Sequence, residues 1–240
     1  MNQAPMPTGT LYLLPTYLSE LPDTGSLSGL SLELANTLDF YIVENTRSAR
    51  RFIASLKISK AIDSLTFFEF DKENPLLGLK EFVYNHKGQN IGILSEAGCP
   101  CIADPGSEAV KIGHEIGMNI VPVPGPSSIL LSLMGSGFNG QSFVFHGYLP
   151  IEKNERVQTL LKLESESSKK KQTQIFIETP YRNNAIISSI LSCLRPETKL
   201  CIAANLTQSD QYLKTKTIRQ WQGNLPELNK IPAIFLISAS

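Results

Sequence analysis

The sequence contains few cysteines and histidines, and neither type is arranged as a metal site. The four cysteines, Cys99, Cys101, Cys193 and Cys201, form no CxxC pair, and no histidine cluster lies beside them at zinc-ligand spacing. We therefore expect free thiols that are buried or incidental, and no metal ion.

A long apolar run is also missing. No stretch approaches the roughly 20 consecutive apolar residues that a membrane-spanning helix requires. The first ten residues, MNQAPMPTGT, have neither the basic start nor the apolar run of a leader peptide. These absences predict a cytoplasmic protein without a membrane partner.

Three common functional motifs are absent. After the first expected strand the sequence reads LLPTYLSELPDTGSL, without the GxGxxG that binds dinucleotides. There is no Walker P-loop, and no nucleophile elbow accompanies His86, His114 or His146, which we expect to be structural or surface residues. The sequence therefore argues against nicotinamide, flavin and P-loop enzymes and against Ser/His/Asp hydrolases.

Short β-rich runs alternate with helical patterns along the first half of the chain. This alternation predicts a parallel sheet with helices on its faces, and the apolar content of 42% is enough for a substantial core. Asp104 is placed to cap the last of these helices, with Pro105 in its first turn. The expected strands are 9–15, 40–44, 64–70, 90–96 and 119–124, and the expected helices are 29–39, 46–57, 76–88 and 105–118.

The stretch PVPGPSS (122–128) fits no regular element and ends in serines suited to capping the apolar segment that follows. We place the domain boundary there, between an N-terminal α/β domain (1–124) and a C-terminal α/β domain (125–240). The second half predicts strands at 142–148, 174–179, 199–205, 211–217 and 232–239, and helices at 152–167 and 181–194.

The two halves differ in charge. Residues 1–124 contain 9 basic and 14 acidic residues, whereas residues 125–240 contain 13 basic and 8 acidic residues. A basic half attracts anionic substrates, although ordinary surface variation would give the same difference. Part of the excess is Lys169, Lys170 and Lys171, which we expect to form a solvated loop.

The segment ILSEAGCPCIADPGSEAV (93–110) combines a strand, a turn of small residues and a helix. Open α/β sheets bind ligands outside the carboxyl ends of their strands, where such turns lie. Ser95, Ala97 and Gly98 let a ligand approach the backbone, and Pro100 stiffens the loop. We interpret it as a ligand loop; the alternative is an ordinary tight connection.

Taken together, several ordered segments resemble the tetrapyrrole-methylase-like class of S-adenosylmethionine-dependent methyltransferases, in particular the bacterial enzymes that methylate a cytidine ribose 2′-oxygen in small-subunit ribosomal RNA. The segments are GTLYLLPT (9–16), ENTRSARRF (44–52), SEAGCPCIADPGSE (95–108), PVPGPSS (122–128), FVFHGYLP (143–150) and ETPYR (178–182). The resemblance covers residues 9–240. It implies two α/β domains, the first with a parallel and the second with a mixed sheet, a cofactor cleft between them, and a homodimer.

The resemblance also implies a cofactor pocket for S-adenosylmethionine. Small and apolar residues suit the adenine and the methionine chain, and loop amides suit the carboxylate. Further contacts are expected near residues 146–149 and Ala204. The matched pocket positions are Pro15, Ser95, Ala97, Gly98, Cys99, Pro100, Cys101, Ile102, Ser127, Ser128 and Ala203.

Methyl transfer from a sulfonium requires mainly an acceptor held in line, and a base if that acceptor is a hydroxyl group. Glu96 is the first candidate for the base because it lies in the cofactor loop. Glu44 is the second, although it could instead cap a helix or pair with Arg47. The candidate contacts to an RNA or a ribosomal subunit are Arg47, Glu178, Tyr181 and Arg182, with Lys153 and Arg156 as further phosphate ligands.

Departures from the ribosomal RNA enzymes bear on the substrate. The family's Glu-Asp-Thr-Arg reads ENTR at 44–47, its Ser-Pro-His-Arg reads TPYR at 179–182, and its Ala-Arg-Glu-Leu-Thr reads AANLT at 203–207. Three functions therefore stay open. They are methylation of a ribosomal RNA ribose, methylation of a tetrapyrrole-like or other small molecule, and catalytically silent binding of the cofactor or of RNA.

Overall fold

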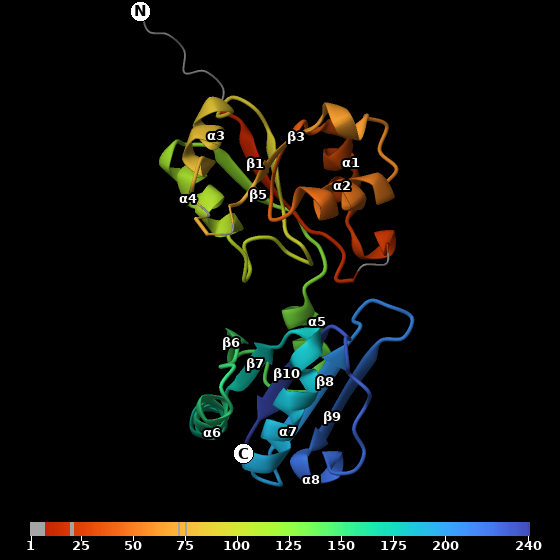
Figure 1. The fold of residues 1–240 in the computed structure, drawn as a ribbon, viewed down its shortest axis with the longest axis vertical. Helices are drawn as coiled ribbons and strands as arrows, with labels where there is room; N and C mark the ends of the chain where they lie inside the picture. The colour runs from red at the N-terminus through yellow and green to blue at the C-terminus, as the bar shows by residue number, and fades with distance from the viewer. Residues whose placement is uncertain (1–7, 20–21, 72, 75) are drawn as a thin grey trace, which may run out of the picture. The chain divides into compact units, whose positions relative to one another are not determined.

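The computed structural model describes residues 8–19, 22–71, 73–74 and 76–240. The chain divides into two compact units, Met1–Pro126 and Ser127–Ser240, called unit 1 and unit 2 below. Each unit has one sheet with helices packed on it (Figure 1). Among the described residues, no helix has the length and apolar character needed to cross a membrane. The leader-peptide prediction concerns the first ten residues, of which 1–7 lie outside the described part.

Unit 1 contains a five-stranded parallel sheet in the order β3-β2-β4-β1-β5, which confirms the predicted parallel sheet. Leu14, Leu94 and Val43 are aligned in register at the ends of neighbouring strands. The residues that follow them therefore lie along one edge of the sheet. The strands are β1 (Thr10–Leu14), β2 (Phe40–Val43), β3 (Thr66–Glu69), β4 (Ile91–Leu94) and β5 (Asn119–Pro122).

Two helices cover each face of this sheet. Helices α1 (Gly29–Thr37) and α2 (Thr46–Ser55) lie on one face, and α3 (Leu79–Asn85) and α4 (Gly106–Glu115) lie on the other (Figure 1). All four predicted helices are present, with ends within three residues of the predicted ones. Neighbouring strands β1 and β4 lead into helices on opposite faces. Their carboxyl ends therefore form the switch point at which open α/β sheets bind ligands.

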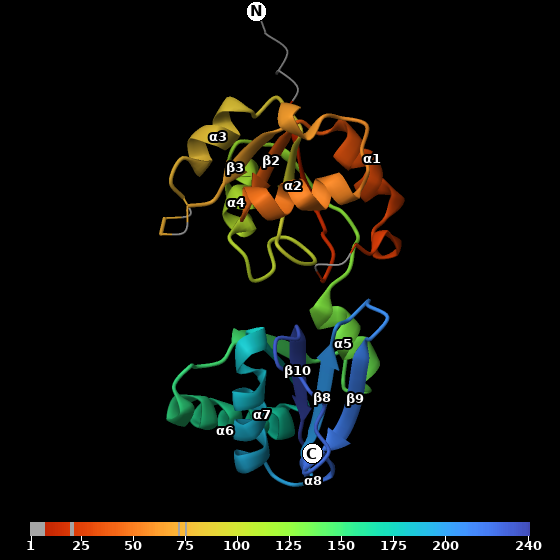
Figure 2. The ribbon, with the colours of Figure 1, turned by 45° about the vertical axis from the view of Figure 1, so that its right-hand side comes forward.

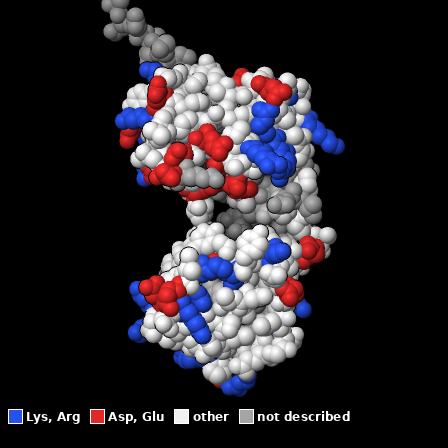
Figure 3. Space-filling model, viewed as in Figure 1, with Lys and Arg blue, Asp and Glu red and all other residues white. Residues whose placement is uncertain are grey.

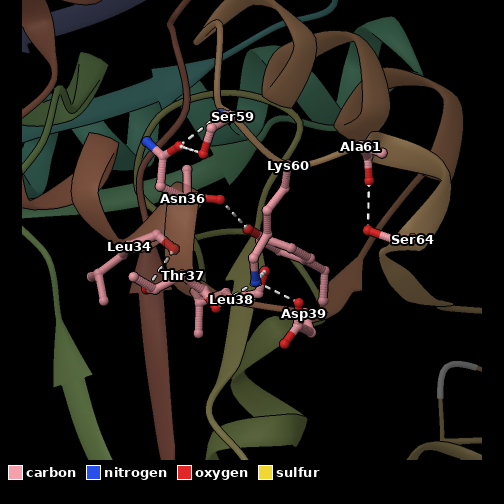
Figure 4. A network of polar contacts seen from close by, with 11 residues as sticks. Leu34, Asn36, Thr37, Leu38, Asp39, Ser59, Lys60, Ala61 and Ser64 are labelled. Carbon is pink, nitrogen blue, oxygen red and sulfur yellow. Dashed lines mark hydrogen bonds and ion pairs between the residues drawn. The ribbon is translucent and has the colours of Figure 1, made fainter.

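Polar contacts tie the end of α1 to the segment that follows α2 (Figure 4). Lys60 Nζ donates to the Thr37 carbonyl at 2.7 Å and pairs with the Asp39 carboxylate at 2.5 Å. Ser59 donates through its amide and its hydroxyl to Asn36 Oδ1, at 2.9 and 3.2 Å. A cation at the last carbonyls of a helix satisfies acceptors that lack helical partners. These contacts help to fix α2 beside α1.

Unit 2 contains a mixed five-stranded sheet in the order β6-β7-β10-β8-β9, which confirms the predicted mixed sheet. Strands β6 and β7 are parallel, whereas β10 runs antiparallel to β7 and β8, and β9 runs antiparallel to β8. The strands are β6 (Phe143–Tyr148), β7 (Thr173–Ile177), β8 (Lys199–Ala204), β9 (Tyr212–Thr217) and β10 (Ala233–Ser238).

The two faces of the unit 2 sheet carry different helices (Figure 2). Helices α6 (Lys153–Lys170), α7 (Asn183–Cys193) and α8 (Ile218–Trp221) enclose the larger core, in which Trp221 is fully buried and donates through Nε1 to the Leu200 carbonyl at 2.9 Å. Helix α5 (Ser128–Ser136) packs on the other face. Gly135 permits this approach, because a Cβ there would lie 2.4 Å from Leu213 Cδ1.

The predicted loop at Lys169–Lys171 is wrong. Lys169 and Lys170 form the last turn of α6, and Lys171 ends the helix in the left-handed conformation. All three side chains are exposed as predicted, but positive charge at the C-terminus of a helix is favoured by the helix dipole. The short elements η1 (Thr24–Ser26), η2 (Ile62–Ser64) and α8 were not predicted, because elements of three or four residues show no periodicity. The predicted helix 181–194 includes the last two residues of η3 (Pro180–Arg182) together with α7.

Candidate cofactor and active site

Three loops meet beyond the carboxyl ends of the unit 1 strands. The Thr16 amide donates to the Gly98 carbonyl at 2.9 Å, and the Gly98 amide donates to the Tyr17 carbonyl at 3.2 Å. The Ser95 hydroxyl also donates to the Gly98 carbonyl, at 3.0 Å. These bonds hold the segment after β1 against the loop after β4.

The third loop, residues 123–126 after β5, packs on the other two. Gly125 lies so close to Pro15 that a Cβ would be 2.2 Å from the proline ring carbons. The Cys99 thiol donates to the Pro126 carbonyl at 3.4 Å. The structure therefore brings together the predicted cofactor residues of unit 1, which are Pro15, Ser95, Ala97, Gly98, Cys99, Pro100, Cys101 and Ile102.

The loop after β4 has an unusual backbone. Gly98, Cys101 and Ala103 have φ angles of 76°, 68° and 65°, a left-handed region that residues with a Cβ rarely adopt. Asp104 stabilises this shape, because its Oδ1 accepts from the Cys101 amide at 3.0 Å and from the Gly106 amide at 2.7 Å. The N-cap residue of α4 is Pro105 and not Asp104 as predicted. Asp104, one residue before the N-cap, still accepts a hydrogen bond from the first amide of the helix.

Carboxylates gather at the same edge of the sheet. Glu44 follows β2 and Glu96 follows β4, and the Glu96 amide donates to Glu44 Oε1 at 2.9 Å. Burial raises the pKa of Glu44; the Glu96 amide opposes this shift, and the negative charges of Asp104 and Glu96 add to it. Burial also raises the pKa of Asp104. The site therefore favours a ligand that carries positive charge.

The two candidate bases differ in environment. Glu96 is exposed, and its Oε1 accepts a hydrogen bond from the Ser48 hydroxyl of α2. Glu44 neither caps α2 nor pairs with Arg47: Asn45 is the N-cap, and within the described part of the chain Arg47 has no hydrogen bond or ion pair. Nothing in the sequence pointed to Ser48, because its contact spans 48 positions along the chain.

The remaining predicted cofactor residues lie in unit 2. Ser127 caps α5, accepting from the Leu130 amide at 3.4 Å, and Ser128 begins the helix. This confirms the predicted capping. Ala203 lies fully buried in β8, paired with Ile234 of β10.

Glu178 and Arg182, two predicted substrate residues, bind each other. The Glu178 side chain is completely buried and lies 2.9 Å from Arg182 Nη2. Its other oxygen accepts from the Thr179 amide at 2.7 Å. A buried carboxylate needs such partners. Neighbouring Tyr181 is 77% exposed and is free to contact a ligand.

The prediction that Arg156 binds phosphate is wrong. Its side chain is buried in unit 2, where Nε donates to Ser189 Oγ at 3.1 Å and Nη1 donates to the Ile151 carbonyl at 2.7 Å. The spacing to Leu160, four residues later on the buried face of α6, was the sequence signal for this position. Lys153 is exposed.

Comparisons with known proteins agree with this architecture. A family model described as Tetrapyrrole (Corrin/Porphyrin) Methylases matches residues 47–222. The chain is 32% identical over 213 residues to the ribosomal RNA small subunit methyltransferase I of Bacillus subtilis (strain 168), which covers 88% of this chain and 68% of the relative. It is 30% identical to the protein of the same name from Vibrio cholerae, over 89% of this chain and 69% of the relative.

The crystal structure of a uroporphyrin-III-C-methyltransferase from Thermus thermophilus has a similar fold, with a TM-score of 0.54 and 15% identity over 96% of this chain and 92% of that one. The family match over residues 47–222 and the two relatives define the class of protein as an α/β methyltransferase, and the two sheets agree with the fold of that class. The chain belongs to the tetrapyrrole methylase family and is an S-adenosylmethionine-dependent methyltransferase.

Proposed function

We propose that this protein transfers a methyl group from S-adenosylmethionine to a ribose 2′-hydroxyl of small-subunit ribosomal RNA. The observation that carries the proposal is the similarity, over most of the chain, to relatives named ribosomal RNA small subunit methyltransferase I. The three-loop site of unit 1 supports it, because this site joins small residues, exposed apolar surface and carboxylates.

The unit 1 residues fit the cofactor in size and charge. Ala97 and Ile102 are exposed, the latter by 53%, and offer apolar contact. Glu44 and Glu96 supply negative charge beside a sulfonium and an ammonium group. When bound, S-adenosylmethionine supplies a methyl group that its sulfonium already activates. The unit 2 positions Ser127, Ser128 and Ala203 stay predictions.

The sequence predicted that amides of the loop after β4 bind the cofactor carboxylate, but several of these amides already have partners in the protein. The amides of Glu96, Gly98 and Cys101 all donate inside unit 1, to Glu44 Oε1, the Tyr17 carbonyl and Asp104 Oδ1. They therefore shape the loop. Recognition of the cofactor carboxylate is therefore left to donors other than these three amides.

Glu96 is the proposed base. In this role its carboxylate accepts the proton that the ribose hydroxyl loses during methyl transfer. Its exposure leaves it accessible, Ser48 orients its side chain, and Glu44 holds its backbone amide. Glu44 is thus a positioning residue for the loop.

We also propose a cytoplasmic homodimer whose partner is the small ribosomal subunit. Support for self-association comes from β6, an edge strand whose Phe143 and Tyr148 are 38% and 60% exposed. Edge strands with exposed aromatic side chains favour pairing with another chain. Sedimentation equilibrium should give the mass of a dimer, and the mass of a monomer would refute the proposed homodimer.

Labelled S-adenosylmethionine and small ribosomal subunits from cells that lack this protein test the function. Label in the RNA, mapped to a ribose, is the expected result, with cofactor binding measured in parallel by calorimetry. Cofactor binding with label only in a small-molecule fraction would identify a different acceptor. Cofactor binding without any label would identify a silent binding protein.

A further inference from the structure

The seven arginines of the chain differ in how the fold neutralises them. Five bind an acidic side chain or a backbone carbonyl, namely Arg50, Arg156, Arg182, Arg195 and Arg219. Arg47 and Arg51 have no hydrogen bond or ion pair to any other residue that the structure describes, and both are exposed. These two lie four positions apart on α2, and therefore on one face of the helix.

This placement does not stabilise α2. Like charges four residues apart repel each other, and a cation in the first turn, where Arg47 lies, opposes the helix dipole. The helix itself contains no acidic residue, so nothing within it offsets the repulsion between the two arginines; the carboxylate of Glu69 at its N-terminus offsets only the dipole effect. The amides of Thr46 and Ser48 already donate to Glu69 Oε2 and Asn45 Oδ1. An anion at this face would therefore be bound by the guanidinium groups.

Figure 3 shows Lys and Arg side chains gathered over α2 of unit 1. We propose that Arg47 and Arg51 together bind phosphate groups of the RNA backbone. The proposal rests on the proposed function and adds Arg51 to the residues that meet the substrate. A guanidinium group binds two phosphate oxygens at once, and the Cβ atoms of such a pair lie about 5–6 Å apart.

The position of this arginine pair suits the proposed reaction. Ser48, whose hydroxyl binds the carboxylate of Glu96, lies on the same helix between the two arginines. An RNA strand held by the pair would therefore lie on the helix that orients the proposed base. The carboxylates of Glu44, Glu96 and Asp104 repel phosphate, so we expect the phosphate groups of the strand at the two arginines and a ribose hydroxyl, which carries no charge, beside Glu96.

The salt dependence of RNA binding tests this proposal. A fluorescein-labelled fragment of small-subunit ribosomal RNA is titrated with the full chain at several salt concentrations. Arg47→Ala and Arg51→Ala should each weaken binding and lower the slope of log K against log salt by about 0.7–0.9, and the double variant by about twice that. Arg51→Lys should keep most of the slope because it keeps the charge.

Arg219→Ala is the matched control. It removes the same charge from an exposed arginine whose side chain is paired with Glu197, and it should leave the slope unchanged. Thermal unfolding should show no loss of stability in Arg47→Ala and Arg51→Ala, which remove a repulsion, and little change in Arg51→Lys and Arg219→Ala. A double variant with the wild-type slope overturns the proposal, and so does a wild-type protein that does not bind the RNA. Arginine-dependent binding to anionic lipid vesicles without binding to RNA overturns it as well.

The same variants separate this inference from the proposed function. If the wild-type protein labels RNA but the double variant has the wild-type salt slope, the proposed function is supported and the phosphate-binding role of the arginine pair is refuted. If RNA binding depends on the two arginines but no methyl group is transferred, the role of the arginine pair is supported and the proposed function is refuted.

Discussion

Replacing Gly98 by alanine tests whether the shape of the loop after β4 is required for the cofactor. Gly98 has a φ of 76°, and a Cβ there would lie 2.9 Å from Leu18 Cδ2 and 3.1 Å from the Pro126 carbonyl oxygen. A left-handed φ costs a residue with a Cβ about 1–2 kcal/mol. Forcing a methyl group into packed space costs about 1–3 kcal/mol more. The loop cannot relax freely, because the Gly98 amide and carbonyl are bonded to Tyr17 and Thr16.

Gly117 provides a matched control. Its φ is 74°, and nothing lies within 4 Å of a Cβ built there. Gly117→Ala therefore carries the backbone cost without the clash. The difference between the two variants isolates the clash, about 1–3 kcal/mol. If that energy opposes the binding-competent loop, cofactor affinity should fall about 5- to 150-fold in Gly98→Ala only.

Urea unfolding and calorimetric titration with S-adenosylmethionine measure the two effects. Both variants should be less stable than the wild type, and Gly117→Ala should bind the cofactor as the wild type does. Equal cofactor affinity in the two variants, despite a larger stability loss in Gly98→Ala, would refute the assignment of this loop to the cofactor.

Three further substitutions test the site. Glu96→Gln should abolish most methyl transfer at saturating cofactor; unchanged turnover would exclude an essential base there. Burial raises the pKa of Glu44, so its ionisation costs stability as the pH rises through that pKa. Glu44→Gln should therefore have a higher Tm than the wild type at neutral pH, and the two Tm values should converge below about pH 4. A Tm difference that did not vary with pH would contradict the raised pKa of Glu44. Arg182→Ala should lower the unfolding free energy by about 3 kcal/mol, because it leaves the buried carboxylate of Glu178 without its ion-pair partner. Adding Glu178→Gln should restore most of this loss, and an Arg182→Ala variant as stable as the wild type would contradict the prediction.

Local sequence patterns determined the framework of this protein. The β-rich runs at 40–44 and 90–96 and the amphipathic pattern at 46–57 predicted β2, β4 and α2, because periodicity depends only on near neighbours. The segment 93–110 was interpreted as a ligand loop for the same local reason, and the motif order implied the family that the comparisons show.

The tertiary structure decided the role of individual charged residues. From sequence alone, Arg47 and Arg182 were phosphate candidates because they lie within motifs, and Arg156 was a further candidate. The fold buries Arg156, pairs Arg182 with Glu178 and leaves Arg47, beside Arg51, without a partner among the residues that the structure describes. These outcomes depend on which face of a helix meets the core and on what lies opposite, and neither is encoded in local sequence.

Contacts between distant segments complete the site in the same way. The bonds from Ser48 to Glu96 and from Cys99 to Pro126 join positions 48 and 27 residues apart. They arise because parallel strands end at one edge of the sheet, so loops remote in sequence emerge together. The sequence by itself determined the elements and the family, whereas strand order and register decided which side chains meet.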